Sequence, residues 1–245
     1  MKTIDPDLLL RAYSIGVFPM ADSRGADDVY WVEPKKRGIL PIDQFRLSRS
    51  LAKTIRSERF TVTCDTAFAE VVAQCAESTD DRPDTWINTA IESAYADLHR
   101  RGHAHSVECW RDGRLVGGLY GVRLGGAFFG ESMFSRESNA SKVALAWLIA
   151  RLKVGRFRLL DCQFITDHLR SLGAIEVSRD DYVALLDGAL GVAGLGSGAA
   201  GTAGAEGWSP PDFFALDGDA TRPDRRTVSG PISGCTIVQL LGQTS

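Results

Sequence analysis

The stretch FFGESMFSRESNASK, residues 128–142, joins an apolar run to a strongly helical one. It places a carboxylate, Glu131, and a thioether, Met133, in what the pattern predicts to be an open turn at the end of a strand. Such loops often carry functional side chains on a rigid scaffold. In an extended backbone Glu131 and Met133 would share one face, with Ser132 on the other. A solvated turn with an incidental glutamate is the alternative, because one carboxylate in a loop is weak support for a site.

The segments on either side of this stretch predict a mixed sheet. Before it, alternating segments separated by the turns Asp112-Gly113 and Gly125-Gly126 predict an antiparallel meander over 105–130. After it, apolar residues spaced i, i+3, i+4 and i+7 predict a helix that ends at Gly155. The remaining pattern predicts a strand at 158–163, a helix at 167–172, a strand at 174–177 and a helix at 179–186. We therefore expect an α+β fold whose mixed sheet is flanked by helices.

The first hundred residues are expected to be mainly helical. Asp5-Pro6 predicts the start of a short helix that ends before Gly16. Further helices are expected after Ser48, from Asp65 to Glu77, and from Asp84 or Thr85 to Gly102, with extended chain at 17–20, 30–34 and 60–64. We expect a small helical N-terminal domain at 1–63 and a catalytic domain at 64–187.

The C-terminal part differs in composition. Residues 188–207 are dominated by Gly and Ala, which predicts a flexible linker. The tail at 208–245 is rich in Pro, Asp and Arg as far as a final apolar run. We expect that run, from Cys235 to Leu241, to add a strand to the body.

Composition limits the classes of function. The 245 residues carry a net charge of −3, which argues against a broadly basic nucleic-acid coat, so any such contact must come from a local patch. The five cysteines are odd in number and scattered, as in a reduced cytoplasmic protein. No apolar run is long enough for a membrane span, and the N-terminus carries acids where a signal peptide needs basic residues. We expect a cytoplasmic protein with no membrane contact.

One local basic patch is predicted on the helix after Ser48. Arg49, Lys53, Arg56 and Arg59 recur at helical spacing and would form one cationic face. A solvated helix face is the plainer interpretation.

The strand at 158–163 carries two polar side chains on an otherwise apolar face. Asp161 and Gln163 alternate with Leu160 and Cys162, so both would point the same way. An acid in such a place is either catalytic or a structural carboxylate bonded to the backbone, and both interpretations stay open. His103, His105 and Cys109 match no common zinc spacing, so we expect no metal.

The strand, meander, helix and Leu-Gly-Ala ending resemble the N-acetyltransferase (GNAT) architecture. Coenzyme A members of that class hold pyrophosphate on a Gly-x-Gly turn before the central helix. Here the turn reads SRESNAS, residues 135–141, so acyl-CoA is a poor donor. An acyl-CoA-dependent N-acetyltransferase is kept as the alternative function.

A more specific resemblance rests on several motifs in order: HAHSVE at 103–108, LVGGLYGV at 115–122, FGESMFSR at 129–136, NASK at 139–142, LDCQ at 160–163 and SLGA at 171–174. They closely resemble the bacterial leucyl/phenylalanyl-tRNA–protein transferases. The resemblance runs from about Leu8 to Leu186. It implies transfer of Leu or Phe, and of Met less well, from charged tRNA to proteins with an N-terminal Arg or Lys, creating a degradation signal (N-end rule). It also implies no metal and no cofactor, and we expect a monomer.

The resemblance assigns roles by position. Glu131, Asp161 and Gln163 fall on catalytic positions, and Trp86 on the aromatic that holds the terminal adenosine. Arg49, Lys53 and Arg56 fall on the helix that binds the acceptor stem of the tRNA. The walls of the aminoacyl side-chain pocket correspond to Met133, Leu119, Leu148, Leu152 and Leu160.

The chemistry of the transfer suggests how the catalytic residues divide the work. We expect Asp161 to take the proton of the attacking amine, relayed through Gln163, and Glu131 to orient the amine or the ribose. One position departs from the family, because Met20 stands where a tryptophan often follows Phe-Pro.

Overall fold

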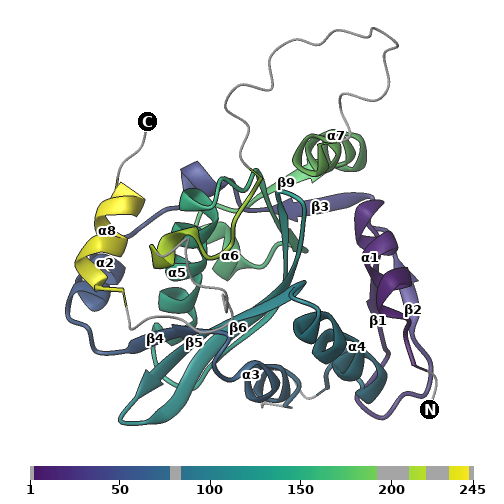
Figure 1. The fold of residues 1–245 in the computed structure, drawn as a ribbon, viewed down its shortest axis with the longest axis horizontal. Coiled ribbons are helices and arrows are strands. Elements are labelled where there is room, and N and C mark those ends of the chain that lie inside the picture. Colours follow the sequence, from purple (N-terminus) through teal and green to yellow (C-terminus); the bar gives the residue numbers. More distant parts are fainter. Residues whose placement is uncertain (1–2, 78–83, 192–209, 219–231, 243–245) are drawn as a thin grey trace, which may run out of the picture.

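The computed structural model describes residues 3–77, 84–191, 210–218 and 232–242. Its centre is a seven-stranded sheet (Figure 1). The strand order is β4-β5-β6-β7-β8-β3-β9. All neighbouring strands are antiparallel except β7 and β8, which are parallel. The strands are β3 (Lys36–Ile39), β4 (Thr61–Cys64), β5 (Ala104–Arg111), β6 (Arg114–Leu124), β7 (Ala127–Ser135), β8 (Leu159–Gln163) and β9 (Ile175–Ser178). The expected α+β fold with a mixed sheet is confirmed.

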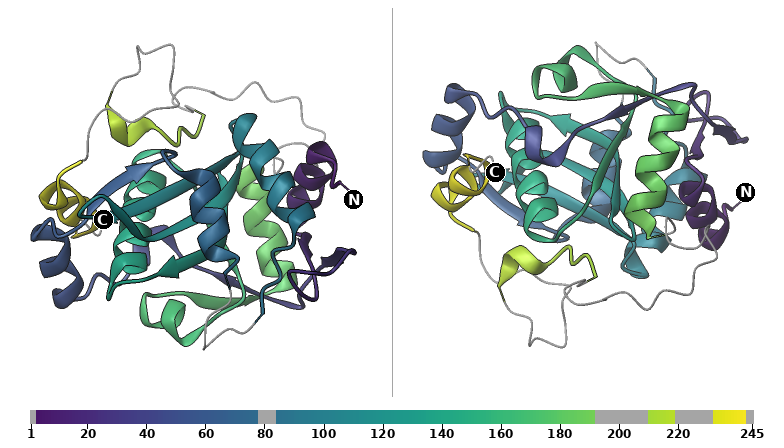
Figure 2. Two further views of the ribbon diagram at one scale, coloured as in Figure 1. Left: turned by 90° about the horizontal axis from the view of Figure 1, so that it is seen from below. Right: turned by 90° about the horizontal axis from the view of Figure 1, so that it is seen from above.

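Helices cover both faces of this sheet, and each face has its own hydrophobic core (Figure 2). One core contains α1 (Pro6–Ser14), α3 (Phe68–Cys75), α4 (Thr89–Arg100) and α7 (Arg179–Leu190). The other contains α2 (Arg49–Arg56), α5 (Ala140–Val154), α6 (Asp167–Ser171) and α8 (Gly234–Gly242). A short ribbon of β1 (Phe18–Met20) and β2 (Tyr30–Val32) forms a separate antiparallel pair.

The meander and the central helix follow the sequence pattern. Asp112 and Gly113 both have positive φ, 51° and 73°, as a tight hairpin turn between β5 and β6 requires. α5 ends at Gly155 as expected, and Ser48 caps α2 by accepting a hydrogen bond from the backbone N–H of Leu51.

Two helix starts differ from the prediction. Asp65 does not cap α3; its carboxylate instead accepts the backbone N–H of Ser106 and lies 2.7 Å from His105 Nδ1. α4 is capped by Asn88 rather than by Asp84 or Thr85, because the Asn88 side chain accepts the N–H of Ile91. In both cases the expected capping residue bonds other groups: Asp65 contacts His105 and Ser106, and Asp84 accepts hydrogen bonds from the backbone N–H groups of Arg24 and Thr85.

The stretch that begins at residue 128 is a strand for longer than expected. β7 continues through Ser135, so Glu131 and Met133 lie inside the strand rather than in a turn. Ser132 pairs with Tyr120 and Gly130 with Gly121, which leaves Glu131 as the extra residue of a β-bulge. The expectation that Glu131 and Met133 share a face is therefore wrong. Glu131 points toward α1 and α4, whereas Met133 packs on the core that contains α5.

The expected boundary between an N-terminal domain at 1–63 and a catalytic domain at 64–187 divides strands that belong to one sheet. β3 and β4 come from the first 63 residues and are strands of the same sheet as β5–β9. α7 continues to Leu190, so the predicted linker begins with helix, and residues 192–209 lie outside the described part of the chain. Cys235 to Leu241 belong to helix α8, not to a strand, because their apolar residues meet α2 and α5 at helical spacing. The domain boundaries themselves stay predictions.

Candidate active site

A cavity of about 330 Å³ lies where β7 and β8 separate. The two strands pair only over residues 127–129 and 159–161, although β7 runs on to Ser135. The cavity takes its walls from residues 130–133 of β7, from the end of β8, and from α5 and α6. Its apolar lining is Leu119, Met133, Leu145, Leu148, Leu160 and Leu169. Leu152, expected in this wall, is buried elsewhere in the core and does not line the cavity.

Aromatic side chains line another part of the cavity. Trp86 and Phe18 belong to this group, as does Phe164, whose side chain is 50% exposed. Phe164 meets Phe18 edge-on, with ring centroids 5.8 Å apart. Met20 also lines the cavity, at the position where the resemblance leads us to expect an aromatic.

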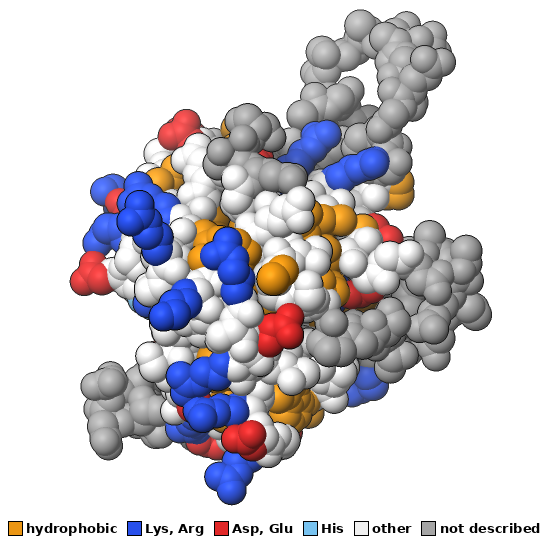
Figure 3. Space-filling view, turned by 90° about the vertical axis from the view of Figure 1, so that its left-hand side faces the viewer, with side chains coloured by type: hydrophobic (Ala, Val, Ile, Leu, Met, Phe, Trp, Pro, Cys, Tyr) orange, Lys and Arg blue, Asp and Glu red, His pale blue; other side chains and the backbone are white. Residues whose placement is uncertain are grey.

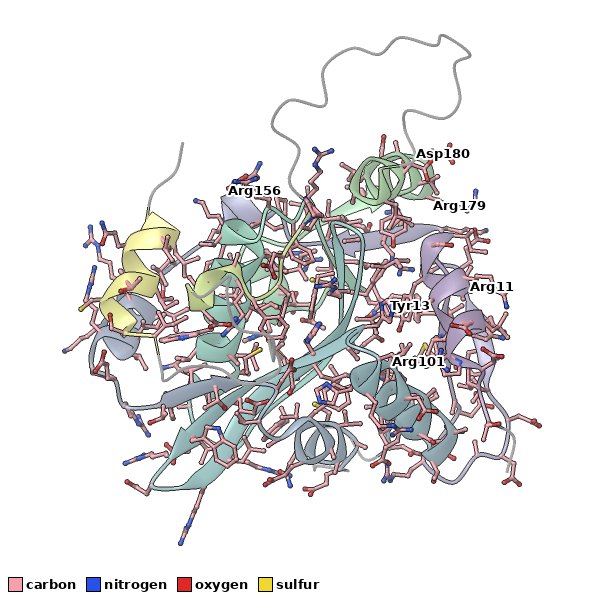
Figure 4. The ribbon with its side chains drawn as sticks, in the orientation of Figure 1. Arg11, Tyr13, Arg101, Arg156, Arg179 and Asp180 are labelled. Carbon is pink, nitrogen blue, oxygen red and sulfur yellow. The ribbon has the colours of Figure 1, made fainter. Side chains whose placement is uncertain are left out.

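Glu131 is the acidic side chain of the cavity wall. It is 8% exposed and is held by neutral donors. Oε1 accepts a 2.8 Å hydrogen bond from Tyr13 and a 3.1 Å bond from Gln163 Nε2, while Oε2 accepts a 2.9 Å bond from Tyr95. Tyr13, which is labelled in Figure 4, reaches it from α1. Burial raises the pKa of Glu131 to about 7, and the two tyrosine hydrogen bonds limit that rise.

Asp161 has different surroundings. Its side chain is fully buried and does not line the cavity. Arg37 Nη2 lies 2.6 Å from Oδ2, and Arg37 Nε donates to both carboxylate oxygens at 2.9 and 3.0 Å. Tyr182 and the backbone N–H of Gln163 donate two more hydrogen bonds, each of 2.7 Å. These contacts favour the structural alternative for Asp161, and its role as general base stays a prediction.

Gln163 connects the two carboxylates. Its backbone N–H bonds Asp161, and its side chain reaches Glu131. Its φ is +54°, and the N–H of Phe164 bonds the carbonyl of Cys162 at 2.6 Å. A residue other than glycine in this conformation is strained, and such strain is most common at functional sites.

The predicted basic patch forms in part. Arg49, Lys53 and Arg56 are exposed on α2, and no salt bridge joins them to an acid within the described residues. We call these three residues the basic row. Arg59 lies beyond the end of the helix and is paired with Glu137 at 2.6 Å, so its place in the row is wrong. Figure 3 faces the side of the molecule that carries α2 and α8, where Lys and Arg side chains gather.

The described part of the chain contains neither a metal-binding cluster nor a membrane-spanning helix. Three or more His, Cys, Asp or Glu side chains that would hold a metal ion do not meet anywhere within it. Across the same residues, every helix is too short or too polar to cross a bilayer.

Several residues of the site were missed from the sequence. Arg37 lies in the run KKRG and looks like its exposed basic neighbours, although it is only 1% exposed. Tyr13 and Tyr95 are separated by 82 residues and occupy ordinary core positions of their helices. Tyr182, which bonds Asp161, is likewise on the buried side of α7. Spacing along the chain carries no signal for these contacts, because each joins separate elements.

The geometry defines a class of chemistry. An apolar cavity fits an uncharged side chain, and a carboxylate that changes protonation near neutral pH lies in its wall together with an amide. This combination suits transfer of an apolar acyl group to an amine, which has to lose a proton as it attacks.

Comparison with known proteins agrees with this class. Residues 39–187 match the family described as leucyl/phenylalanyl-tRNA protein transferase, and residues 2–35 match its N-terminal domain. A protein of Rhizorhabdus wittichii named leucyl/phenylalanyl-tRNA–protein transferase is 84% identical over the full length of both chains. One of the same name from Afipia carboxidovorans is 48% identical over 99% of this chain and 95% of its own. Among solved structures, FemX aligns with a TM-score of 0.47 and 13% identity, over 70% of this chain and 66% of that chain.

The chain therefore belongs to the leucyl/phenylalanyl-tRNA protein transferase family. The family match ends at residue 187, so the described residues at 210–218 and 232–242 lie beyond it.

Proposed function

We propose that this protein transfers Leu or Phe, and Met less well, from charged tRNA to the α-amine of proteins that begin with Arg or Lys. The modified N-terminus would mark these proteins for degradation in the cytoplasm. The observation that carries the proposal is the apolar cavity with Glu131 and Gln163 in its wall, in a chain of this family.

The cavity is proposed to hold the side chain of the transferred residue. A wall of Leu and Met side chains selects by shape and apolar area, and one methylene in such a site discriminates by only about 1–3 kcal/mol. Leu, Met and Phe would therefore be accepted in a graded way, and charged side chains would be rejected because nothing in the apolar wall compensates their desolvation. Trp86 is proposed to contact the terminal adenosine next to this pocket.

Glu131 is proposed to take the proton. The acceptor nitrogen attacks the ester carbonyl carbon, the bond from that carbon to the ribose oxygen breaks, and the nitrogen loses one proton. A carboxylate with a pKa of about 7 accepts that proton and returns it to the departing ribose oxygen. The ester is already activated, so alignment of the two substrates supplies much of the remaining acceleration.

Asp161 and Gln163 are proposed to position rather than to transfer. The Arg37–Asp161 pair fixes the end of β8, and Asp161 holds the backbone N–H of Gln163. Gln163 in turn holds the Glu131 carboxylate at the cavity wall. This division reverses the one expected from the sequence, in which Asp161 was the base and Glu131 the orienting group.

The deciding experiment is transfer from labelled Leu-tRNA to two peptides that differ only in a first residue of Arg or Ala. We expect transfer to the Arg peptide and little to the Ala peptide. No transfer to the Arg peptide, or equally good transfer of acetyl from acetyl-CoA, would contradict the proposal.

A pair of variants tests the cavity. Met133→Asp places a charge in the apolar wall and should abolish Leu transfer with little change in tRNA affinity. Met133→Leu keeps the volume and polarity, and serves as the matched control that retains transfer. Leu transfer by Met133→Asp at the normal rate would show that the side chain of the donor binds elsewhere.

A further inference from the structure

The described residues at 210–218 and 232–242, beyond the family match, pack onto the body. Phe213 is fully buried and stacks on His105 and Phe128, with ring centroids 4.3 and 5.5 Å away. Asp217 accepts two 2.8 Å hydrogen bonds from the buried guanidinium of Arg151. Farther along, α8 packs against both α2 and α5 (Figure 1). These residues are therefore an integral part of the core.

The composition of α5 explains why such cover is needed. Nearly every side chain from Ala140 to Leu152 is buried, so α5 has no polar outer face of the kind usual for a helix on one side of a sheet. The sheet covers one side of α5 through β5 and β6. Much of its remaining surface is covered by α2, by α8 and by residues 42–44 and 215–217.

The start of α8 comes very close to the end of α2. The N–H of Gly234 donates a 3.1 Å hydrogen bond to the Glu58 side chain. A Cβ added to Gly234 would lie 2.2 Å from the carbonyl oxygen of Ile55, which is much shorter than any real contact. Only glycine permits this approach of two backbones. At the other end of α8, a Cβ added to Gly242 would meet no atom within 4 Å.

α2 relies on this packing for a fixed position. It has only 8 residues, and helices of that length are marginal in water without tertiary support. Its buried residues Leu51 and Ile55 belong to the same core cluster as Ile237 and Leu241 of α8. Its other side carries the basic row. α8 contains no charged residue, so it brings no cation of its own to a phosphate.

We infer that α8 is a positioning element for the donor tRNA. It holds α2 against α5 and so fixes the direction in which the basic row meets the phosphates of the acceptor stem. The inference rests on the proposed function and on the role that the family resemblance implies for the basic row, which is to bind the acceptor stem of the tRNA. Without α8 in place, α2 moves relative to the cavity, and the row no longer meets the phosphates while the acyl group is in its pocket.

Two glycine substitutions in the same helix test this role. Gly234→Ala forces the start of α8 away from α2, whereas Gly242→Ala adds the same methyl group in open space. KM and kcat are measured with Leu-tRNA and with leucyl-adenosine, a donor that lacks every phosphate of the acceptor stem. With Gly234→Ala we expect the KM for Leu-tRNA to rise about tenfold and its salt dependence to flatten, because fewer counterions are released. With leucyl-adenosine the variant should behave like the wild type, and Gly242→Ala should match the wild type with both donors.

Equal losses with both donors would overturn the inference, because α8 would then only support the fold. An unchanged KM and salt dependence for Leu-tRNA in Gly234→Ala would overturn it as well. If Gly234→Ala reduces the yield of folded protein, Ile237→Ala removes apolar packing from the same helix without a backbone clash, and the same outcomes apply.

The double variant Arg49→Glu, Arg56→Glu separates this inference from the function on which it rests. A raised KM for Leu-tRNA in that variant, together with a normal KM in Gly234→Ala, contradicts the role of α8 alone. A normal KM in the double variant contradicts the proposed role of the basic row, and with it the inference.

Discussion

Glu131 on β7 and Asp161 on β8, two of the buried carboxylates of the sheet, have opposite electrostatic surroundings. Asp161 is enclosed and paired with the guanidinium of Arg37. Glu131 borders the cavity and is held by the hydroxyls of Tyr13 and Tyr95 and by an amide, all of them neutral. A buried ion pair fixes geometry, whereas a carboxylate held by neutral donors is able to change its protonation near neutral pH. Asp161 therefore serves as part of the scaffold in this account, and Glu131 is the group that moves a proton.

The largest effect on stability is expected when the ion pair between Arg37 and Asp161 is broken. Asp161→Asn leaves the guanidinium of Arg37 buried without a counter-charge, which should lower the free energy of unfolding by about 3–5 kcal/mol. Denaturant unfolding at pH 7 measures this loss. Activity should fall with the folded fraction.

A double variant sharpens that result. Arg37→Met combined with Asp161→Leu removes both charges and keeps most of the volume, so much of the lost stability should return. If Asp161→Asn is as stable as the wild type, the pair does not hold the end of β8 and the scaffold role is wrong.

Glu131→Gln should change stability in the opposite direction. Because the pKa of Glu131 is raised from 4.5 to about 7 in the folded protein, its ionisation lowers stability as pH rises through this window. The neutral variant escapes that loss and should be more stable at pH 8 by up to about 3 kcal/mol. The difference should nearly disappear at pH 4, where most of the wild-type carboxyl is protonated in both states. Unfolding at the two pH values checks the sign, and a variant less stable than the wild type at pH 8 would contradict it.

A smaller effect is expected from the tyrosines. Tyr95→Phe removes a hydrogen bond that lowers the pKa of Glu131, so the acid limb of the pH–rate profile should move to higher pH. Transfer at pH 7 should slow about fivefold, with a nearly normal rate at pH 9. Tyr182→Phe is the matched control, because it removes one hydroxyl from Asp161 instead. It should cost about 1 kcal/mol of stability and leave the acid limb in place. If the acid limb of the pH–rate profile moves in both Tyr95→Phe and Tyr182→Phe, the proposed difference between Glu131 and Asp161 would be wrong.

Much of the fold was predictable because its signals are local. The turn at Asp112-Gly113, the apolar spacing of α5 and its end at Gly155 depend on neighbours along the chain, and the structure confirms each. The bulge at Glu131 was not predictable, because it arises from the pairing of β7 with β6. α8 was mistaken for a strand because a short apolar run fits either element until its partner is known.

Several residues that line the cavity were predictable from the sequence, but their contacts were not. Glu131, Gln163, Trp86 and Met133 all line the cavity, as the family resemblance leads us to expect. The partner of Asp161 was not visible, because Arg37 comes from a strand 124 residues away in the sequence. Such long-range partners determine which acid is paired with a cation, and therefore which acid is able to take the proton.

The most direct test of the account is the pH dependence of single-turnover Leu transfer to a saturating Arg peptide, compared between wild type and Glu131→Gln. In the wild type the rate should rise through pH 7 with the ionisation of Glu131, and further as the acceptor amine, with a pKa of about 8, loses its proton. Glu131→Gln should be slower by about 10²-fold or more at neutral pH and should keep only the rise that belongs to the amine. A variant that transfers at nearly the wild-type rate, with an unchanged profile, would show that Glu131 does not take the proton.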